Sequence, residues 1–265
     1  MGVKASSQPN PESSPPPVTG VNRVLIAGAA SPIAVAAAAE LAHNYRLRLL
    51  DIKQSEGPAQ GEWMVGSISD YETCCRAVHG VDAVVNFALA RKTGADWESD
   101  TDRIFDVNVK GLYQLLLASS EAGIRRFVHI SSTAPVIAHW FEGTGGILLD
   151  APYRVTGRYT LNKAAQELVC TTVAQMLGLP VVMLRIWRPV DASAVDVRRP
   201  GMIDRADVGR ACGRALKCQM KKTVETFYVV ATAEAHGRFE TEPTRELLGF
   251  EPAHDFSDLP PGEAE

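Results

Sequence analysis

The segment RVLIAGAASPIA, residues 23–34, decides the fold class of this chain. Residues 24–27 form a short apolar run directly after Arg23, which predicts a buried strand over residues 23–27. The apolar stretch continues to residue 42, nearly long enough to cross a bilayer. Gly28, Ser31 and Pro32 interrupt it, so it divides into a strand, a turn and a helix. The segment therefore predicts the first strand–helix unit of an α/β domain and no membrane-spanning helix.

Strand and helix patterns alternate through the rest of the chain. Alternation of this kind is typical of a parallel sheet that is covered by helices on both faces. The sequence thus predicts a Rossmann-type, doubly wound parallel sheet in the α/β class. The expected strands are residues 46–50, 63–65, 82–87, 126–130 and 181–186, and the expected helices are residues 71–78, 98–120 and 159–177.

The length of 265 residues suits one large domain. Residues 1–20 contain five prolines and several serines, which predicts a disordered tail. We expect residues 21–265 to form one nucleotide-binding domain, with a small substrate lobe from about residue 187 to residue 265.

Charge and cysteine content exclude several classes of protein. The net charge is −4 and there is no long basic block, which argues against a nucleic-acid-binding protein. The five cysteines show neither a Cys-x-x-Cys pair nor zinc-finger spacing, so we expect no metal site. Scattered free thiols are typical of a reducing compartment, and we expect a cytoplasmic protein.

The turn after the first strand is a candidate dinucleotide site. A complete fingerprint would have glycine at positions 28, 31 and 34, and only Gly28 is present. Ser31 and Ala34 are small enough for close approach, but this loop alone fits an ordinary strand–helix turn equally well. Asp51 ends the next strand, where a carboxylate accepts hydrogen bonds from an adenosine ribose and repels a 2′-phosphate. The pattern predicts NAD in preference to NADP.

The sequence YTLNK, residues 159–163, places a phenol and an ammonium group one helical turn apart. A neighbouring positive charge favours the phenolate form of a tyrosine, so we expect Lys163 to make Tyr159 a better proton acceptor. This pair is a candidate general base for proton transfer.

These features together resemble the extended short-chain dehydrogenase/reductases, the NAD-dependent epimerase/dehydratase group. The segments that carry the resemblance are VGSISD at 65–70, DAVVNFA at 82–88, NVKG at 108–111, FVHISST at 127–133, Tyr159 with Lys163, and LLGFEP at 247–252. The family usually has aspartate in place of Ser67. The resemblance implies cofactor contacts from Gly28, Ser31, Pro32, Ile33, Asp51, Ser67, Ile68, Phe87, Ala88 and Lys163.

The resemblance also implies catalytic roles. Tyr159 would exchange the proton of the reacting hydroxyl or carbonyl, and Lys163 would hold the nicotinamide ribose. Thr133, in preference to Ser132, would hydrogen-bond the reacting oxygen, and Asn108 would support a water relay to Lys163. Thr133 also fits a strand-end hydroxyl that only satisfies the backbone, and Asn108 fits a local helix contact.

Substrate recognition departs from the usual family pattern. A short lobe leaves little surface for a nucleotide-sugar, and the chain looks most like the uronate (sugar-acid) dehydrogenase branch. In that branch an arginine binds the substrate carboxylate, and Arg198 or Arg199 lies in roughly that place. Arg188 replaces a family asparagine, and Ser132 would also contact the substrate. That branch has Gly-Ser where this chain has Trp187-Arg188, so we expect an altered pocket.

The sequence leaves three functions open. The first is an NAD-dependent dehydrogenase of a sugar or sugar acid, and the second is an epimerase or dehydratase with tightly bound NAD. The third is a non-catalytic protein that uses a dinucleotide-loaded domain to bind a partner. Family members commonly dimerise through the helix pair at residues 108–120 and 163–177, so we expect a homodimer.

Overall fold

The computed structural model describes residues 15, 18, 20–55, 60–91, 93, 94, 97–143 and 145–262. Most of the tail predicted over residues 1–20 lies outside the described residues. Within the described part of the chain, no helix combines the length and apolar character needed to span a membrane.

The centre of the molecule is a seven-stranded sheet in which every neighbouring pair of strands is parallel. The strand order is β3-β2-β1-β4-β5-β6-β9. This order confirms the predicted Rossmann-type, doubly wound α/β fold. The strands are β1 (Arg23–Ala27), β2 (Arg46–Asp51), β3 (Glu62–Val65), β4 (Ala83–Asn86), β5 (Arg126–Ser132), β6 (Val181–Ile186) and β9 (Val224–Val229).

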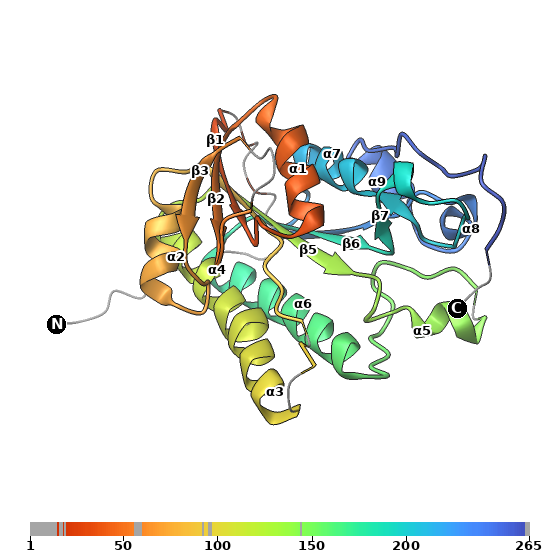
Figure 1. Ribbon diagram of the computed structural model, residues 1–265, viewed down its shortest axis with the longest axis horizontal. Helices are drawn as coiled ribbons and strands as arrows, with labels where there is room; N and C mark the ends of the chain where they lie inside the picture. The colour runs from red at the N-terminus through yellow and green to blue at the C-terminus, as the bar shows by residue number, and fades with distance from the viewer. Residues whose placement is uncertain are drawn as a thin grey trace.

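Helices cover both faces of the sheet (Figure 1). The layer on one face contains α1 (Pro32–Ala42) and α7 (Arg205–Ala215), and the other contains α2 (Tyr71–Val78), α4 (Leu112–Glu121) and α6 (Arg158–Leu177). Side chains alternate across a strand, and in β1 Val24 and Ile26 pack in the first layer while Leu25 and Ala27 pack in the second. An apolar strand without polar alternation is therefore buried on both sides.

The helix expected over residues 98–120 is a single helical run in three parts. It consists of α3 (Trp97–Phe105), a π-helical turn η1 (Asp106–Gly111) and α4. Gly111 ends the π turn where a β-carbon would approach Ile68 Cγ1 to 2.9 Å, so the run passes very close to the loop after β3. The wider turn changes which residues face the sheet, and periodicity alone did not reveal it.

The expected boundary of the substrate lobe differs from the structure. Both α7 and β9 fall after residue 187, yet they belong to the central layers. The strand β9, with the sequence VETFYV, was not predicted because Glu225 and Thr226 interrupt its apolar run. The remaining short elements after residue 187 are β7 (Pro189–Val190), η2 (Ala192–Ala194), β8 (Ile203–Asp204), α8 (Ala233–His236) and α9 (Glu242–Glu246), and α5 (Ala138–Glu142) lies between β5 and α6.

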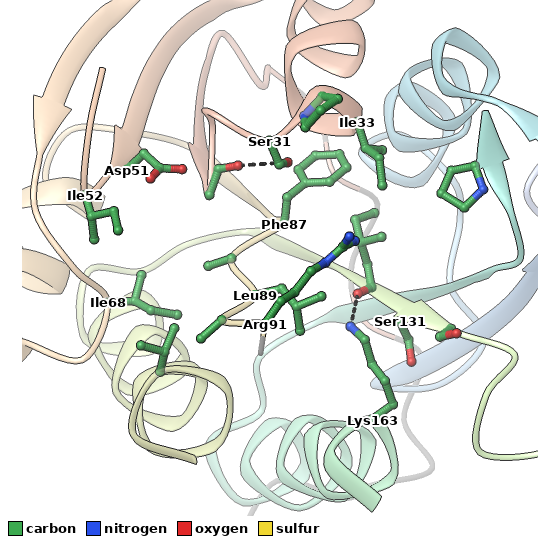
Figure 2. A pocket seen from close by; sticks show the side chains of 18 of the residues that line it. Ser31, Ile33, Asp51, Ile52, Ile68, Phe87, Leu89, Arg91, Ser131 and Lys163 are labelled. Atoms are coloured by element: carbon green, nitrogen blue, oxygen red, sulfur yellow. Dashed lines mark hydrogen bonds between the residues drawn. The ribbon is translucent and has the colours of Figure 1, made fainter. Parts of the chain in front are cut away.

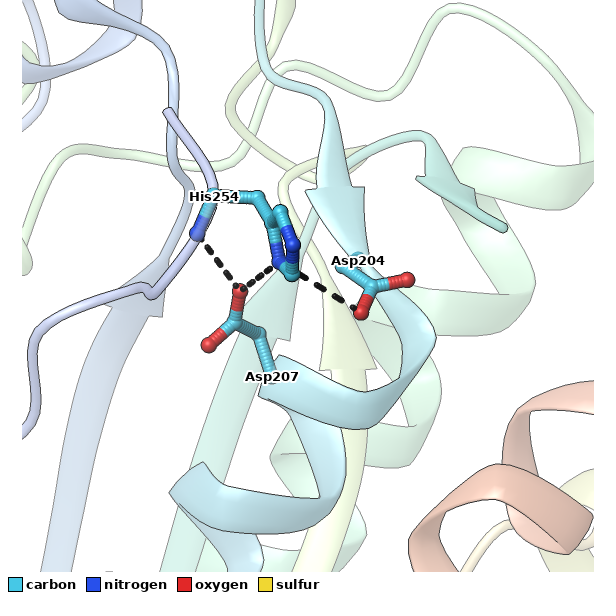
Figure 3. A group of neighbouring side chains, drawn as sticks. All are labelled: Asp204, Asp207 and His254. Carbon is cyan, nitrogen blue, oxygen red and sulfur yellow. Dashed lines mark hydrogen bonds and ion pairs between the residues drawn. The ribbon is translucent and has the colours of Figure 1, made fainter. Parts of the chain in front are cut away.

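The start of α7 anchors the C-terminal segment. Asp207 is fully buried and accepts hydrogen bonds from the backbone N–H groups of Ala253 (2.9 Å) and His254 (3.3 Å). It also pairs with Arg210. Nδ1 of His254 lies 3.8 Å from a carboxylate oxygen of Asp207 and of Asp204 (Figure 3). These contacts give Asp207 a structural role, which is to fix the segment after α9 against α7.

Candidate active site

A cavity of about 970 Å³ opens at the carboxyl ends of the strands. It lies where the strand order reverses between β1 and β4, the usual position of ligands in open α/β sheets. In Figure 2, Asp51 and Ile68 lie toward one end and Lys163 and Ser131 toward the other. Predicted site residues that line the cavity are Gly28, Ser31, Pro32, Ile33, Asp51, Ser67, Ile68, Phe87, Ala88, Ser132, Tyr159, Lys163 and Arg188.

The turn after β1 is closed with a single glycine. Gly28 has φ +77°, and a β-carbon there would lie 2.6 Å from Cα of Ala88. Glycine is needed at this position because the loops after β1 and β4 touch. Ser31 begins α1: its Oγ accepts a hydrogen bond from the Ala34 backbone N–H (3.3 Å) and donates to the Gly28 carbonyl (3.2 Å). Serine at position 31 therefore completes the turn without a second glycine.

Asp51 is attached to the same turn. Its Oδ2 accepts a hydrogen bond from the Ala30 backbone N–H at 2.9 Å. This contact fixes the carboxylate at the edge of the cavity and joins the end of β2 to the loop before α1. Among the contacts of the described residues, Oδ1 of Asp51 accepts no hydrogen bond, so this oxygen could accept one from a ribose hydroxyl in the cavity.

Tyr159 and Lys163 extend into the cavity from the first turns of α6. Tyr159 is half exposed, whereas Lys163 is only 4% exposed and donates from Nζ to the Ile130 carbonyl at 3.1 Å. Burial lowers the pKa of Lys163 to about 8, and the negative charge of Glu167 opposes this shift. The ammonium is thus close to the pH range in which it loses its proton.

The hydroxyl groups beside this pair come from Ser131 and Ser132. Both serines line the cavity, whereas Thr133 is buried and is not part of the lining. The strand β5 ends at Ser132, and the Thr133 backbone N–H donates to the Ile186 carbonyl at 3.1 Å as the chain turns. The structure therefore gives Ser132, the less favoured candidate in the sequence, the position facing the cavity.

Asn108 holds a loop instead of facing the cavity. Its Oδ1 accepts from the Ala90 N–H (2.7 Å), and its Nδ2 donates to the Ala90 carbonyl (2.9 Å) and to Asn162 Oδ1 (2.9 Å). Its backbone carbonyl accepts a hydrogen bond from Gln166 Nε2 at 3.1 Å. These contacts connect the loop after β4 to α6, and the expected water relay stays a prediction.

The arginines expected to bind a substrate carboxylate lie elsewhere. Neither Arg198 nor Arg199 lines the cavity, and Arg198 forms an ion pair with Glu234 at 3.1 Å. The arginines that do line the cavity are Arg91, Arg103, Arg188 and Arg205. The family motifs did not reveal Arg91 and Arg205. Their positions, in the loop after β4 and at the first residue of α7, could have indicated them.

Trp187 forms an apolar wall of the cavity. Its ring centroid lies 5.1 Å from that of Trp140 and 6.0 Å from that of Phe239. Gly201 has φ +78°, and a β-carbon there would lie 2.8 Å from Cγ of Trp187 and nearer still to other ring atoms. The guanidinium of Arg188, whose backbone has φ +45°, lies 5.4 Å from the indole centroid. The Trp187 ring is thus packed against two aromatic rings, a guanidinium group and the backbone at Gly201.

Comparison with known proteins places this site in a family. Uronate dehydrogenase of Pseudomonas syringae pv. tomato is 27% identical over 172 residues, which are 63% of this chain and 60% of that protein. A 3 beta-hydroxysteroid dehydrogenase/Delta 5→4-isomerase of Mycobacterium tuberculosis is 32% identical over 155 residues, 56% of this chain and 42% of that protein. The chain thus spans between 42% and 60% of the length of these relatives.

Solved structures agree on the fold. The crystal structure of uronate dehydrogenase from Agrobacterium tumefaciens has a TM-score of 0.73 at 20% identity and covers 91% of both chains. The model of the NAD dependent epimerase/dehydratase family matches residues 24–210, which include the whole cofactor turn and the Tyr159–Lys163 pair. The chain therefore belongs to the NAD-dependent epimerase/dehydratase family, as the order of its motifs predicted.

Proposed function

We propose that this protein is an NAD-dependent oxidoreductase that transfers a hydride between nicotinamide and a hydroxyl or carbonyl group of a sugar or sugar acid. The observation that carries the proposal is that Tyr159, Lys163 and Ser132 line one cavity with Asp51. The uronate dehydrogenase and hydroxysteroid dehydrogenase relatives support dehydrogenase chemistry, and the first of them supports a sugar acid.

The residues around the cavity suit NAD. Asp51 would accept hydrogen bonds from the adenosine ribose, and its charge disfavours a 2′-phosphate. The first turn of α1, from Ser31 to Ile33, would face the pyrophosphate, whose charge the helix N-terminus stabilises. Ser67, Ile68, Phe87 and Ala88 would complete the adenosine side of the cavity. Bound NAD would supply the hydride acceptor.

The proton chemistry falls to α6 and the end of β5. Tyr159 would take the proton of the substrate hydroxyl as general base. Lys163 would bind the nicotinamide ribose and favour the tyrosinate by its charge. Ser132, in place of Thr133, would donate a hydrogen bond to the reacting oxygen. Asn108 would keep the loop at Ala90 in register with α6.

The substrate end of the cavity suits an anion. Arg188 and Arg205 reach it from the segment after β6 and from the start of α7. Arginine binds carboxylates with a planar pair of donors, so these side chains would hold a sugar acid by its carboxylate. This arrangement replaces the one expected from Arg198 and Arg199.

A substrate panel tests the proposal. NADH formation would be followed with NAD and a set of aldoses and the corresponding uronic acids. We expect turnover, a lower KM for the acids than for the neutral sugars, and a higher kcat/KM with NAD than with NADP. Turnover confined to neutral sugars would refute the arginine assignment, and a preference for NADP would refute the role of Asp51. Absence of turnover with cofactor released on denaturation would favour an epimerase or dehydratase.

We further propose that the protein is a homodimer joined through α4 and α6. Tyr113 on α4 and Leu161, Leu168 and Met176 on α6 are large apolar side chains between 46% and 66% exposed. Sedimentation at micromolar concentration is expected to give the mass of two chains, and Leu168→Arg is expected to give one. A monomer mass for the unmutated protein would contradict this proposal.

A cytoplasmic location is also part of the proposal. All five cysteines are free thiols in the structure, which suits a reducing compartment.

A further inference from the structure

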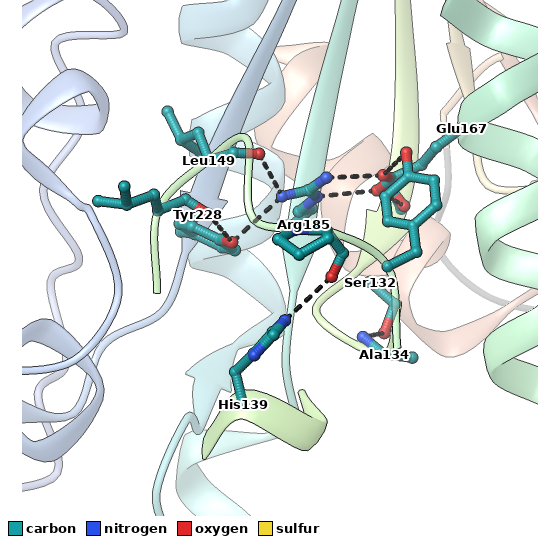
Figure 4. Close-up of polar contacts among 11 residues, drawn as sticks. Ser132, Ala134, His139, Leu149, Glu167, Arg185 and Tyr228 are labelled. Atoms are coloured by element: carbon teal, nitrogen blue, oxygen red, sulfur yellow. Dashed lines mark hydrogen bonds and ion pairs between the residues drawn. The ribbon is translucent and has the colours of Figure 1, made fainter. Parts of the chain in front are cut away.

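The carboxylate of Glu167 lies fully buried one helical turn beyond Lys163. It accepts hydrogen bonds from Ser131 Oγ (2.6 Å) and Tyr153 OH (2.8 Å). Arg185 donates to the same carboxylate from Nε (3.0 Å) and Nη2 (2.8 Å), in the two-pronged geometry typical of strong ion pairs (Figure 4). One carboxylate therefore receives four donors from three residues.

These donors belong to different parts of the site. Ser131 is at the end of β5, Arg185 is on β6, and Tyr153 is in the segment before α6. Arg185 also donates from Nη1 to the Leu149 carbonyl (2.9 Å) and the Tyr228 hydroxyl (3.1 Å). Glu167 thus connects the helix that carries Tyr159 and Lys163 to two strands and to the loop on the substrate side.

Stability alone is a poor explanation for this arrangement. Removing two charges from water costs several kcal/mol per ion, and apolar replacements of a buried ion pair are often neutral or stabilising. This pair lies one helical turn beyond Lys163, where it fixes the positions of α6, β5 and β6 relative to one another.

The charged and titratable groups around Lys163 support this view. Cys170 is on the same helix, His129 on β5 and Arg91 in the loop after β4. Burial raises the pKa of the Cys170 thiol, and burial together with Lys163 keeps the pKa of His129 well below its usual value, so both groups are neutral near pH 7. The positive charge of Arg91 lowers the pKa of Lys163. Among these described groups, Glu167 supplies the negative charge.

We propose that Glu167 is a positioning residue that places a negative charge one helical turn from Lys163 and holds the Ser131 hydroxyl in register with α6. This proposal rests on the proposed function in one respect, which is that Lys163 acts together with Tyr159 in proton transfer. The charge on Lys163 itself is measurable in the protein without substrate or cofactor.

The test is a lysine NMR titration of the full-length protein labelled at the lysine side-chain carbons, with Lys163→Met used to assign the Lys163 signal. In the unmutated protein we expect a titration near pH 8. In Glu167→Gln the ammonium loses its nearby negative charge, so its midpoint is expected to fall by about one pH unit or more. Ser131→Ala removes one hydrogen bond but no charge, and it is expected to leave the midpoint unchanged.

Two further variants keep the test decisive if Glu167→Gln alone does not fold. Arg185→Met removes the competing cation, and the double variant Arg185→Met/Glu167→Gln differs from it only at Glu167. The Lys163 midpoint is expected to be lower in the double variant than in Arg185→Met. Equal midpoints in each matched pair would overturn the proposal.

Turnover is a separate readout. Where the unmutated protein oxidises a substrate, the alkaline limb of kcat is expected to move to lower pH in Glu167→Gln, in step with the NMR midpoint. A shifted midpoint without any turnover in the unmutated protein would leave the role of Glu167 intact and refute the proposed function.

Discussion

Replacement of Tyr159 by phenylalanine is expected to lower kcat by about 10²–10⁴-fold, the usual contribution of a positioned acid or base. The phenol is half exposed in the cavity and lies one turn from the buried Lys163, so its removal takes away the proton acceptor and little else. NADH fluorescence is expected to give an unchanged Kd, because Tyr159 is not among the residues proposed to hold the cofactor.

The matched control for this substitution is Tyr71→Phe. That tyrosine begins α2, its hydroxyl donates to Glu121, and it is not part of the cavity lining. Its loss is expected to leave kcat at the level of the unmutated protein. If Tyr159→Phe retained full turnover, Tyr159 would not be the general base.

Replacement of Gly201 by alanine is expected to disrupt the substrate side of the cavity. The new β-carbon would overlap the Trp187 ring, which Trp140 and Phe239 hold in place. Overpacking costs about 1–3 kcal/mol, and a left-handed backbone costs a residue with a β-carbon about 1–2 kcal/mol. We expect the free energy of unfolding to fall by about 2–5 kcal/mol, or roughly 5–15 °C in Tm.

Gly213→Ala is the matched control for this effect. Gly213 lies within α7, and a β-carbon there would meet only Leu41 Cδ2 at an ordinary 3.6 Å. Alanine in a helix is favoured over glycine by about 0.5–1 kcal/mol, so this variant is expected to be at least as stable as the parent. Thermal unfolding of both variants decides the matter, and equal Tm values would show that the Trp187 wall yields to the added carbon.

Sequence patterns predicted the elements whose signals are local. The apolar run of β1, the turn at Gly28 and the four-residue spacing in α6 each follow from a few neighbouring residues. The structure brings Gly28, Asp51, Tyr159 and Lys163 to one cavity, as the family resemblance implied. These positions were predictable because strand ends in a parallel sheet converge at one edge.

The features that the sequence did not reveal depend on packing between distant segments. The π turn at residues 106–111 has a residue pattern that also fits an α-helix, so the sequence did not predict where the helical register changes. Whether Ser132 or Thr133 faces the cavity is decided by where β5 ends and the chain bonds to Ile186. The arginines of the substrate side likewise depend on how the short β7–β8 pair turns, and β-pairs of two residues leave no periodic signal.

The reversal of strand order between β1 and β4 has a consequence for how this site can change in evolution. The side of the cavity that we propose for the adenosine is lined by residues between 28 and 88, whereas the proposed substrate side is lined by residues 131–132 and by residues between 186 and 205. Because these stretches are separate along the chain, recombination or insertion in the later stretches would change substrate preference and leave the proposed nucleotide site unaltered. Function in such a fold resides in the site, so one ancestral nucleotide module can serve many reactions.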